Sequence, residues 1–173
     1  MPSFMSRPEN LRPSQLPLWW LLKSISLLPF PVLYALSTFL YVVLYYVIGY
    51  RKKVVRQNLA NAFPHTSAAE RLKIEKQFFL NLTDIIMETF KLVSLSPAAL
   101  SKRVNVRNRE AIDACLAKGN AVMVIGAHLG NWEYMSTAGN ALFHYPVDGV
   151  YKPLSSSFFE AYMRFMRGGS ELR

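Results

Sequence analysis

The distribution of apolar residues divides the chain into one long apolar stretch near its start and shorter amphipathic blocks after it. A polar tail with several prolines, residues 1–17, precedes an apolar stretch over residues 18–50. The uncharged part of this stretch is long enough to cross a bilayer. Pro29 and Pro31 interrupt its beginning, so the regular helix is predicted to start near Val32.

Two interpretations of the apolar stretch compete. Aromatic residues at both of its ends match the belts that anchor membrane helices at the two interfaces, which favours a transmembrane anchor. The alternative is a hydrophobic hairpin or a segment that lies within one leaflet. A basic run, Arg51-Lys-Lys-Val-Val-Arg56, follows directly and indicates the cytoplasmic side of a membrane. We expect this run to contact lipid headgroups.

The next blocks have helical spacing. A short helix is predicted over residues 54–63, and Pro64 ends it. Thr66 or Ser67 is then expected to cap a long amphipathic helix that runs to about Leu95. Its apolar face contains Leu72, Phe79, Leu82, Ile86, Phe90 and Val93.

From Val104 onward, short runs rich in β-branched residues alternate with helical blocks. Strands are predicted over 104–106, 121–126 and 145–151, and helices over 108–118, 132–142 and 155–167. Alternation of this kind predicts an α/β fold with parallel strands and helical crossovers. Three strands form a small sheet, so we expect the chain to be the front part of a longer enzyme.

The composition of the chain indicates a membrane segment and an anionic partner. Hydrophobic residues make up 51% of the chain, and 20 Lys and Arg against 11 Asp and Glu give a net charge of +9. Such a charge suits an anionic surface, namely nucleic acid, acidic lipid headgroups or an acidic protein; of these, nucleic acid is not expected as a partner. The single cysteine, Cys115, excludes an internal disulfide and a cysteine-rich zinc site.

The strongest chemical signal is a histidine between a predicted strand and a predicted helix. His128 follows the strand over 121–126, and Glu133 comes five positions later. Ligands of α/β proteins bind at this end of the strands. A carboxylate beside an imidazole holds the tautomer that accepts a proton, so His128 is predicted to be a general base that Glu133 orients. Backbone N–H groups at Gly130 and Asn131 are expected to stabilise an oxyanion.

Other kinds of site match the sequence less well. A metal site lacks a second histidine near His128, and the glycines around it lack the Gly-Lys-Ser/Thr ending of a phosphate loop. Ser136 has no glycine-flanked nucleophile elbow. His65 and His144 have no carboxylate at a useful spacing and are expected to be structural or exposed. Neither a metal nor a cofactor is therefore predicted.

Three stretches resemble the lipid A biosynthesis acyltransferases, the lauroyl and myristoyl transferases of Gram-negative bacteria, and are most similar to Bacteroidetes-type members. They are Tyr50-Arg-Lys-Lys-Val-Val-Arg-Gln-Asn-Leu-Ala-Asn-Ala-Phe-Pro64, Gly126-Ala-His-Leu-Gly-Asn-Trp-Glu133 and Val150-Tyr-Lys-Pro153. The resemblance covers residues 19–167. It implies an N-terminal membrane helix and amphipathic helices, followed by a mostly parallel βαβαβα core of the glycerolipid-acyltransferase type that is incomplete at its C-terminus.

The resemblance also implies roles for particular residues. The catalytic dyad of the family corresponds to His128 and Glu133. Tyr151 and Lys152 correspond to residues that help to bind the substrate or its phosphates. A later family arginine corresponds to Arg167, with Arg164 as the alternative, and it would bind a phosphate or the developing charge.

The expected protein is an inner-membrane acyltransferase with a tail (1–17), a membrane anchor (18–50) and a catalytic domain (51–173) on the cytoplasmic side. It is expected to move a fatty acyl chain from acyl-acyl carrier protein to a hydroxyl of a lipid A precursor. Its partners would be the acyl carrier protein, the precursor and anionic membrane lipids. The alternatives are acyl transfer to another glycolipid or a lysophospholipid, and a truncated, inactive lipid-binding protein.

Overall fold

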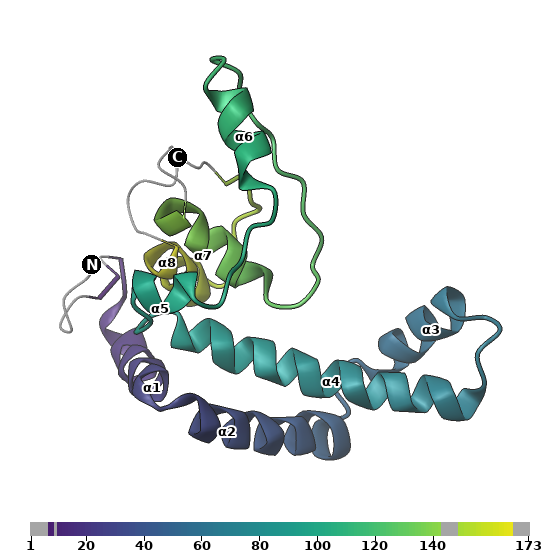
Figure 1. Cartoon of the computed structure of the whole chain (residues 1–173). Coiled ribbons are helices and arrows are strands. Elements are labelled where there is room, and N and C mark those ends of the chain that lie inside the picture. The colour runs from purple at the N-terminus through teal and green to yellow at the C-terminus, as the bar shows by residue number, and fades with distance from the viewer. Residues whose placement is uncertain (1–6, 9, 143–148, 168–173) are drawn as a thin grey trace. The chain divides into compact units, whose positions relative to one another are not determined.

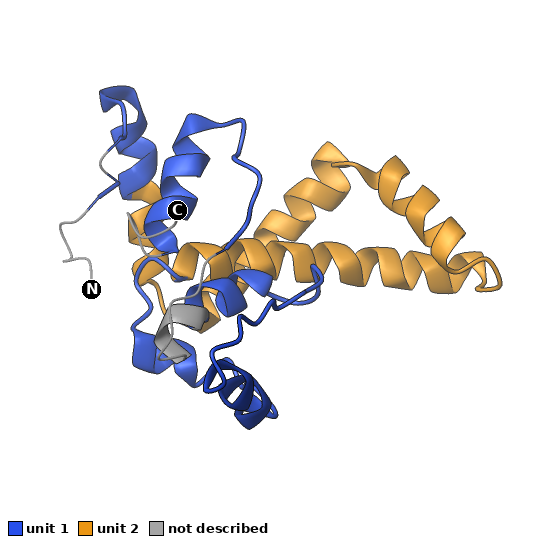
Figure 2. Cartoon of the chain, turned by 90° about the horizontal axis from the view of Figure 1, so that it is seen from above, with its two compact units in different colours: residues 1–20, 92–173 blue, residues 21–91 orange. Residues whose placement is uncertain are grey.

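The computed structural model describes residues 7–8, 10–142 and 149–167. The chain divides into two compact units: unit 1 contains residues 1–20 and 92–173, and unit 2 contains residues 21–91 (Figure 2). Helix α1 (Leu16–Leu27) begins in unit 1 and continues into unit 2.

Unit 2 is built on two long helices that lie side by side, α2 (Phe30–Val42) and α4 (Ala68–Lys91) (Figure 1). A π-helical stretch, η2 (Val43–Ile48), continues α2, and α3 (Lys52–Ala62) follows and packs on α4. Helix α2 starts slightly earlier than predicted, since one proline caps it and the next lies in its first turn. A missing N–H has no cost there, because the first-turn N–H groups have no partner within the helix.

An aromatic cluster holds unit 2 together. Tyr41 and Tyr45 stack with their ring centroids 5.5 Å apart, and Phe79 of α4 meets Tyr45 edge-on at 5.2 Å. Polar side chains are paired inside the same interface, where the Ser37 hydroxyl donates to Thr83 Oγ1 at 3.1 Å. The interface therefore combines aromatic packing with satisfied hydrogen bonds.

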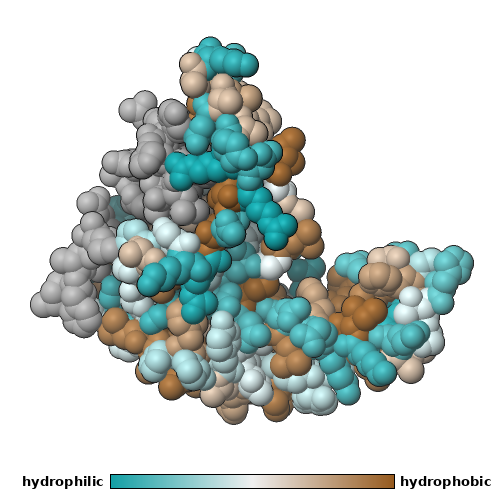
Figure 3. Space-filling model, in the orientation of Figure 1, coloured by the Kyte–Doolittle hydropathy of each residue, from teal (hydrophilic) through white to brown (hydrophobic). Residues whose placement is uncertain are grey.

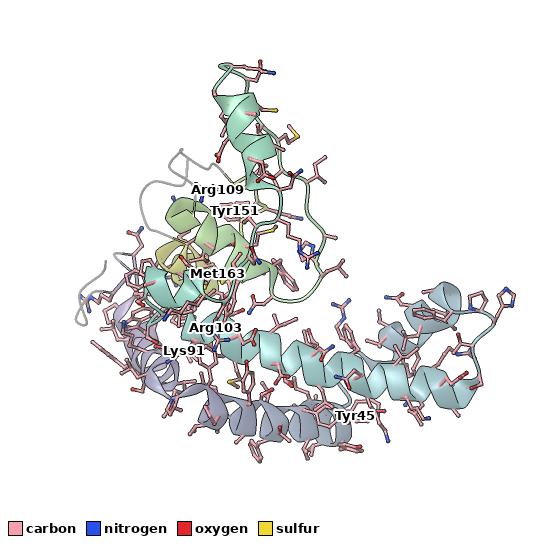
Figure 4. The ribbon with its side chains drawn as sticks, in the orientation of Figure 1. Tyr45, Lys91, Arg103, Arg109, Tyr151 and Met163 are labelled. Carbon is pink, nitrogen blue, oxygen red and sulfur yellow. The ribbon has the colours of Figure 1, made fainter. Side chains whose placement is uncertain are left out.

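The segment Phe30–Ile48 is long and apolar enough to cross a membrane, although core helices of soluble proteins and signal sequences share this property. One face of α2 is buried in unit 2. Large apolar side chains on other faces are open, with Phe39 exposed to 68% and Val47 of η2 to 75%. At the far end of unit 2, the Lys91 ammonium donates to the carbonyl oxygens of Ser26 and Leu28, both at 2.9 Å (Figure 4).

Unit 1 contains the remaining helices: η1 (Pro13–Gln15), α5 (Pro97–Ser101), α6 (Arg109–Leu116), α7 (Trp132–Leu142) and α8 (Ser157–Met166). Its core joins α5, α7 and α8 through Leu92, Leu100, Tyr134, Ala138 and Met166. Trp19 is fully buried and meets the rings of Tyr162 and Phe165 edge-on, at 5.7 and 5.1 Å. The hydroxyls of Ser96 and Ser156 cap α5 and α8 by accepting backbone N–H groups.

The predicted helices are confirmed within a few residues. The blocks over 108–118, 132–142 and 155–167 form α6, α7 and α8, and the block over 54–63 forms most of α3. The long amphipathic helix forms α4 but ends at Lys91, before the predicted Leu95. Side-chain periodicity was sufficient for these elements because a helix satisfies its own backbone hydrogen bonds.

The predicted α/β fold, with its mostly parallel βαβαβα core, is wrong. The described residues contain helices and no strand. Residues 104–106 and 121–126 are irregular or extended without a paired neighbour, and so is the described end of 145–151, whose first four residues lie outside the described part. A strand exists only where a second strand pairs with its backbone, and an apolar run does not specify that partner. In unit 1 the apolar faces of α5, α7 and α8 bury one another instead.

Candidate functional site

The site is built where α7 begins. Gly130 has a left-handed backbone (φ 56°) and a Cβ there would meet nothing within 4 Å, so glycine is favoured for conformation rather than for space. Asn131 follows, and its Oδ1 accepts the backbone N–H of Tyr134 at 3.3 Å. Together these residues turn the chain into α7 and place Glu133 in its first turn.

Glu133 is buried and receives four hydrogen bonds. The Arg167 guanidinium binds it through two nitrogens, with Nε 3.0 Å from Oε2 and Nη2 2.6 Å from Oε1. The Trp132 indole donates to Oε1 at 3.1 Å, and the Ser136 hydroxyl shares its one proton between the Glu133 carbonyl oxygen at 3.1 Å and Oε2 at 3.3 Å. A bidentate guanidinium compensates the buried charge and fixes the start of α7 against the end of α8.

Tyr151 extends this cluster. The Arg167 guanidinium carbon lies 5.4 Å from the centroid of the Tyr151 ring. The Tyr151 hydroxyl donates to Glu160 Oε1 at 2.6 Å, and the Leu154 backbone N–H donates to Glu160 Oε2 at 2.9 Å. Glu160 therefore holds the loop over residues 151–154 to α8.

These hydrogen bonds shift the pKa values of Glu160 and Tyr151 in opposite directions. The Leu154 N–H and then the Tyr151 hydroxyl favour the ionised carboxylate, so the pKa of Glu160 lies below its ordinary value. The same carboxylate raises the pKa of Tyr151, because it accepts the phenolic proton. Tyr151 thus stays neutral and Glu160 stays charged at neutral pH.

His128 is close to Glu133 in the sequence, but in the described part of the chain it is not hydrogen-bonded to this cluster. It belongs to the exposed irregular segment before α7, and its ring centroid lies 4.6 Å from that of Trp132, with the two rings at an angle of 58°. Among the described residues, the donors to the Glu133 carboxylate are Arg167, Trp132 and Ser136, and His128 is not one of them. The structure therefore brings together Glu133, Arg167 and Tyr151, and the His128–Glu133 dyad stays a prediction.

The other predicted residues lie at the edge of the cluster. Lys152 and Arg164 are exposed. Arg164 is near enough to favour ionisation of Glu160 electrostatically. Sequence reasoning missed Glu160, although an acidic residue in the first turn after the Ser156 cap is a typical helix-start signal that marks it.

The cluster offers a guanidinium, a carboxylate and a phenol, with an imidazole on the segment that leads into α7. A family model described as bacterial lipid A biosynthesis acyltransferase matches residues 14–156. The chain belongs to this family of acyltransferases. The match includes His128, Glu133 and Tyr151, and it confirms the resemblance seen in the sequence. No curated protein and no solved structure matches the chain.

Proposed function

We propose that the protein is an inner-membrane acyltransferase that transfers a fatty acyl chain from acyl-acyl carrier protein to a hydroxyl of a lipid A precursor. The observation that carries this proposal is the lipid A acyltransferase match, which contains both members of the predicted dyad. The cluster around Glu133 supports it, because a guanidinium, a carboxylate and a phenol can bind the anionic and hydroxyl groups of a lipid A precursor.

In the proposed reaction His128 is the general base. Its free ring nitrogen takes the proton of the acceptor hydroxyl while the hydroxyl oxygen attacks the thioester carbonyl carbon. The carbon–sulfur bond of the tetrahedral intermediate then breaks, and the carrier thiolate takes the proton back from the imidazolium. Backbone N–H groups at Gly130 and Asn131 are proposed to stabilise the oxyanion. Residues of the chain supply every proton transfer, so the proposal includes no metal or cofactor.

Glu133 must exchange a partner to orient His128. A carboxylate has about four hydrogen-bond sites, and Glu133 already receives four hydrogen bonds. The contact with Ser136 is the longest at 3.3 Å, so it is the one that His128 would replace most easily. Arg167 could then keep both of its bonds or give one to a substrate phosphate, with Tyr151, Lys152 and Arg164 beside it.

The proposed location and partners follow from charge and hydropathy. The candidate membrane helix Phe30–Ile48 is followed by the basic run 51–56, which favours a cytoplasmic catalytic part. A net charge of +9 suits an acidic carrier protein, a phosphorylated precursor and anionic membrane lipids. Nucleic acid is not proposed as a partner.

The proposal predicts that His128→Ala and Glu133→Ala each reduce acyl transfer by about 10²-fold or more, because general-base catalysis contributes roughly that factor. The measurement is transfer of a labelled acyl group from acyl carrier protein to a lipid A precursor, with the chain in membranes. Lys118→Ala, an exposed residue beyond α6, is the matched control and should keep the full rate.

A wild-type rate in either dyad variant contradicts the dyad. Parallel assays with a second glycolipid and a lysophospholipid as acceptors identify the acceptor class. Absence of product with every acceptor, while the chain still binds lipid, supports the lipid-binding alternative over the enzyme.

A further inference from the structure

Unit 2 contains a cavity that the acyltransferase site does not use. It is a pocket between α3 and α4 that is open to solvent and has a volume of about 370 Å³, at the lower end of the range for ligand pockets. Its lining consists of four aliphatic residues and three charged ones: Leu59, Ala60, Ala68 and Leu72, with Arg56, Arg71 and Glu75. Figure 3 shows apolar surface where the two helices converge.

The negative charge of the carboxylate in this lining, Glu75, is already compensated by Arg56 and Tyr45. Glu75 is only 3% exposed and accepts hydrogen bonds from Arg56 Nε and from the Tyr45 hydroxyl, both at 2.9 Å. Burial alone raises the pKa of Glu75, but these hydrogen bonds outweigh burial and bring the pKa below its ordinary value. Glu75 therefore acts as an ionised anchor that fixes Arg56, whose side chain stays 55% exposed.

The second cation of the lining is fixed as well. Arg71 donates through Nη1 to the carbonyl oxygens of Phe63 and Thr66. These hydrogen bonds hold the loop between α3 and α4 to the Arg71 side chain. Two guanidiniums held in place lose little conformational entropy when they bind a ligand. With one carboxylate against them, they leave the cavity with a net positive charge.

A cavity with aliphatic walls and two fixed guanidiniums fits an amphiphile with an anionic head. A phosphate accepts paired hydrogen bonds from a guanidinium, and the aliphatic walls can cover glycerol and the first acyl carbons. The source of such a ligand is close at hand, because α3 begins at Lys52, directly after the candidate membrane helix ends at Ile48. A cavity in this place lies at the lipid–water boundary if the helix spans the membrane as proposed.

We propose that the cavity between α3 and α4 is a specific binding site for the phosphate headgroup of an anionic phospholipid. The proposal rests on the proposed membrane location but not on the acyl-transfer chemistry. It differs from diffuse attraction to the basic run, because it requires two particular arginines and an unfilled cavity.

The test titrates the purified full chain, in uncharged detergent micelles, with three probes by calorimetry: dioctanoyl phosphatidylglycerol, dioctanoyl phosphatidylcholine and inorganic phosphate. We expect saturable one-to-one binding of phosphatidylglycerol, and at least about tenfold weaker binding of the other two. Phosphatidylcholine lacks the net negative charge, and inorganic phosphate lacks the apolar part.

Two kinds of variant separate a built site from diffuse charge. Arg71→Lys and Arg56→Lys keep the charge but lose the paired donors, and Ala60→Phe fills the cavity and keeps every charge. Each arginine variant should weaken phosphatidylglycerol binding by about tenfold, the usual effect of losing a hydrogen bond to a charged group. Ala60→Phe should weaken it by at least about as much, because the phenyl ring occupies the space that the lipid would fill. Lys73→Gln and Lys76→Gln, exposed residues of α4 outside the lining, are the controls and should change binding less than twofold.

Equal losses in the lysine controls, unchanged binding in Ala60→Phe, or inorganic phosphate binding as tightly as the lipid would each overturn the proposal. Arg56→Lys and Ala60→Phe keep the test valid if Arg71→Lys unfolds the loop. His128→Ala distinguishes this proposal from the acyltransferase function, since it should lose transfer and keep phosphatidylglycerol binding. If the wild-type chain transfers acyl groups but does not bind phosphatidylglycerol, only the proposed lipid site between α3 and α4 is rejected.

Discussion

At the scale of single residues, the buried carboxylate of Glu133 determines how the site is arranged. A buried charge is tolerated only where opposite charge and hydrogen bonds compensate it, and Arg167 provides most of this compensation through two bonds. The pair links residues 34 positions apart in the sequence. It therefore contributes to the tertiary structure of unit 1 as well as to the chemistry of the site.

Removing Arg167 alone should destabilise the protein more than replacing both Arg167 and Glu133 with apolar residues. Arg167→Ala leaves the Glu133 charge buried and unpaired, which we expect to lower the free energy of unfolding by about 3 kcal/mol. The double variant Arg167→Met with Glu133→Leu removes both charges and should recover most of that loss. Thermal unfolding in detergent measures both variants, and a double variant as unstable as the single one would contradict this view of the pair.

The contact between Tyr151 and Glu160 should depend on pH in acid. Because the folded-state pKa of Glu160 is lowered, its stabilising effect is complete above the ordinary glutamate pKa of about 4.3 and disappears as the pH falls through the lower folded value. Tyr151→Phe removes one of the two donors. The difference in melting temperature between wild type and Tyr151→Phe should be constant from about pH 7 to pH 5 and shrink below about pH 4.

Sequence reasoning named Glu133, Tyr151 and Arg167, which the structure brings together, but it did not predict the ion pair between Glu133 and Arg167. The position of Glu133 after the predicted turn marked it as a site residue, and the family resemblance added Tyr151 and Arg167. It assigned Glu133 to His128 and Arg167 to a substrate phosphate, whereas the structure pairs Glu133 with Arg167. This pairing depends on how α7 and α8 pack, which local spacing does not specify.

At the scale of secondary-structure elements, the connection between η2 and α3 relies on unusual backbone conformations. Gly49 (φ 68°) ends the π-helical stretch, and Arg51 (φ 50°) precedes α3, so both have left-handed conformations within three residues. Glycine adopts this region at little cost, whereas an arginine there is strained. The connection therefore combines one favourable residue and one unfavourable residue.

Substitutions at these two positions should have opposite effects. Gly49→Ala should destabilise the protein by about 1 kcal/mol, because alanine is strained at a positive φ although its Cβ would meet only Lys52 Cδ, at 3.8 Å. Arg51→Gly should stabilise it by about 0.5 kcal/mol, the relief of strain being partly offset by the greater freedom of the unfolded chain. Melting temperatures check both, and shifts of the same sign would exclude a conformational cause.

Helices could be predicted from the sequence, whereas strands could not. The apolar faces of α4 and α8 follow the helical period, and Ser96 and Ser156 mark two helix starts as their residue types suggest. The run over residues 121–126 has the composition of a strand, but its conformation depends on a partner that composition does not identify. Among the described residues, that segment has no regular secondary structure.

At the scale of the whole molecule, two features of the chain point toward a lipid surface: the excess of positive charge and the candidate membrane helix. Helix α2 uses Leu33, Ser37 and Tyr41 as its buried positions and leaves Phe39 largely exposed. An exposed phenylalanine is unfavourable in water but favourable against acyl chains.

Phe39→Lys should therefore separate a membrane helix from a helix on a water-soluble protein. In a bilayer, a lysine near the middle of the span costs about 2.5–3.5 kcal/mol, so much less of the protein should stay in the membrane after carbonate extraction. On a surface in water, the same substitution changes stability by only about 0.5 kcal/mol. Ala69→Lys, an exposed position at the start of α4, is the control, and equal retention of both variants would contradict a spanning helix.

The exposed apolar run before α7 has a consequence for the protein as it is synthesised. Residues 121–125 are uncharged and free of proline, and two of them, Met123 and Ile125, are 87% and 88% exposed. Short segments of this kind form cross-β contacts between identical chains, because each copy offers the backbone groups that the next can pair with. Aggregation of newly made chains depends on their concentration, so slow synthesis and early engagement by chaperones should increase the yield of folded protein.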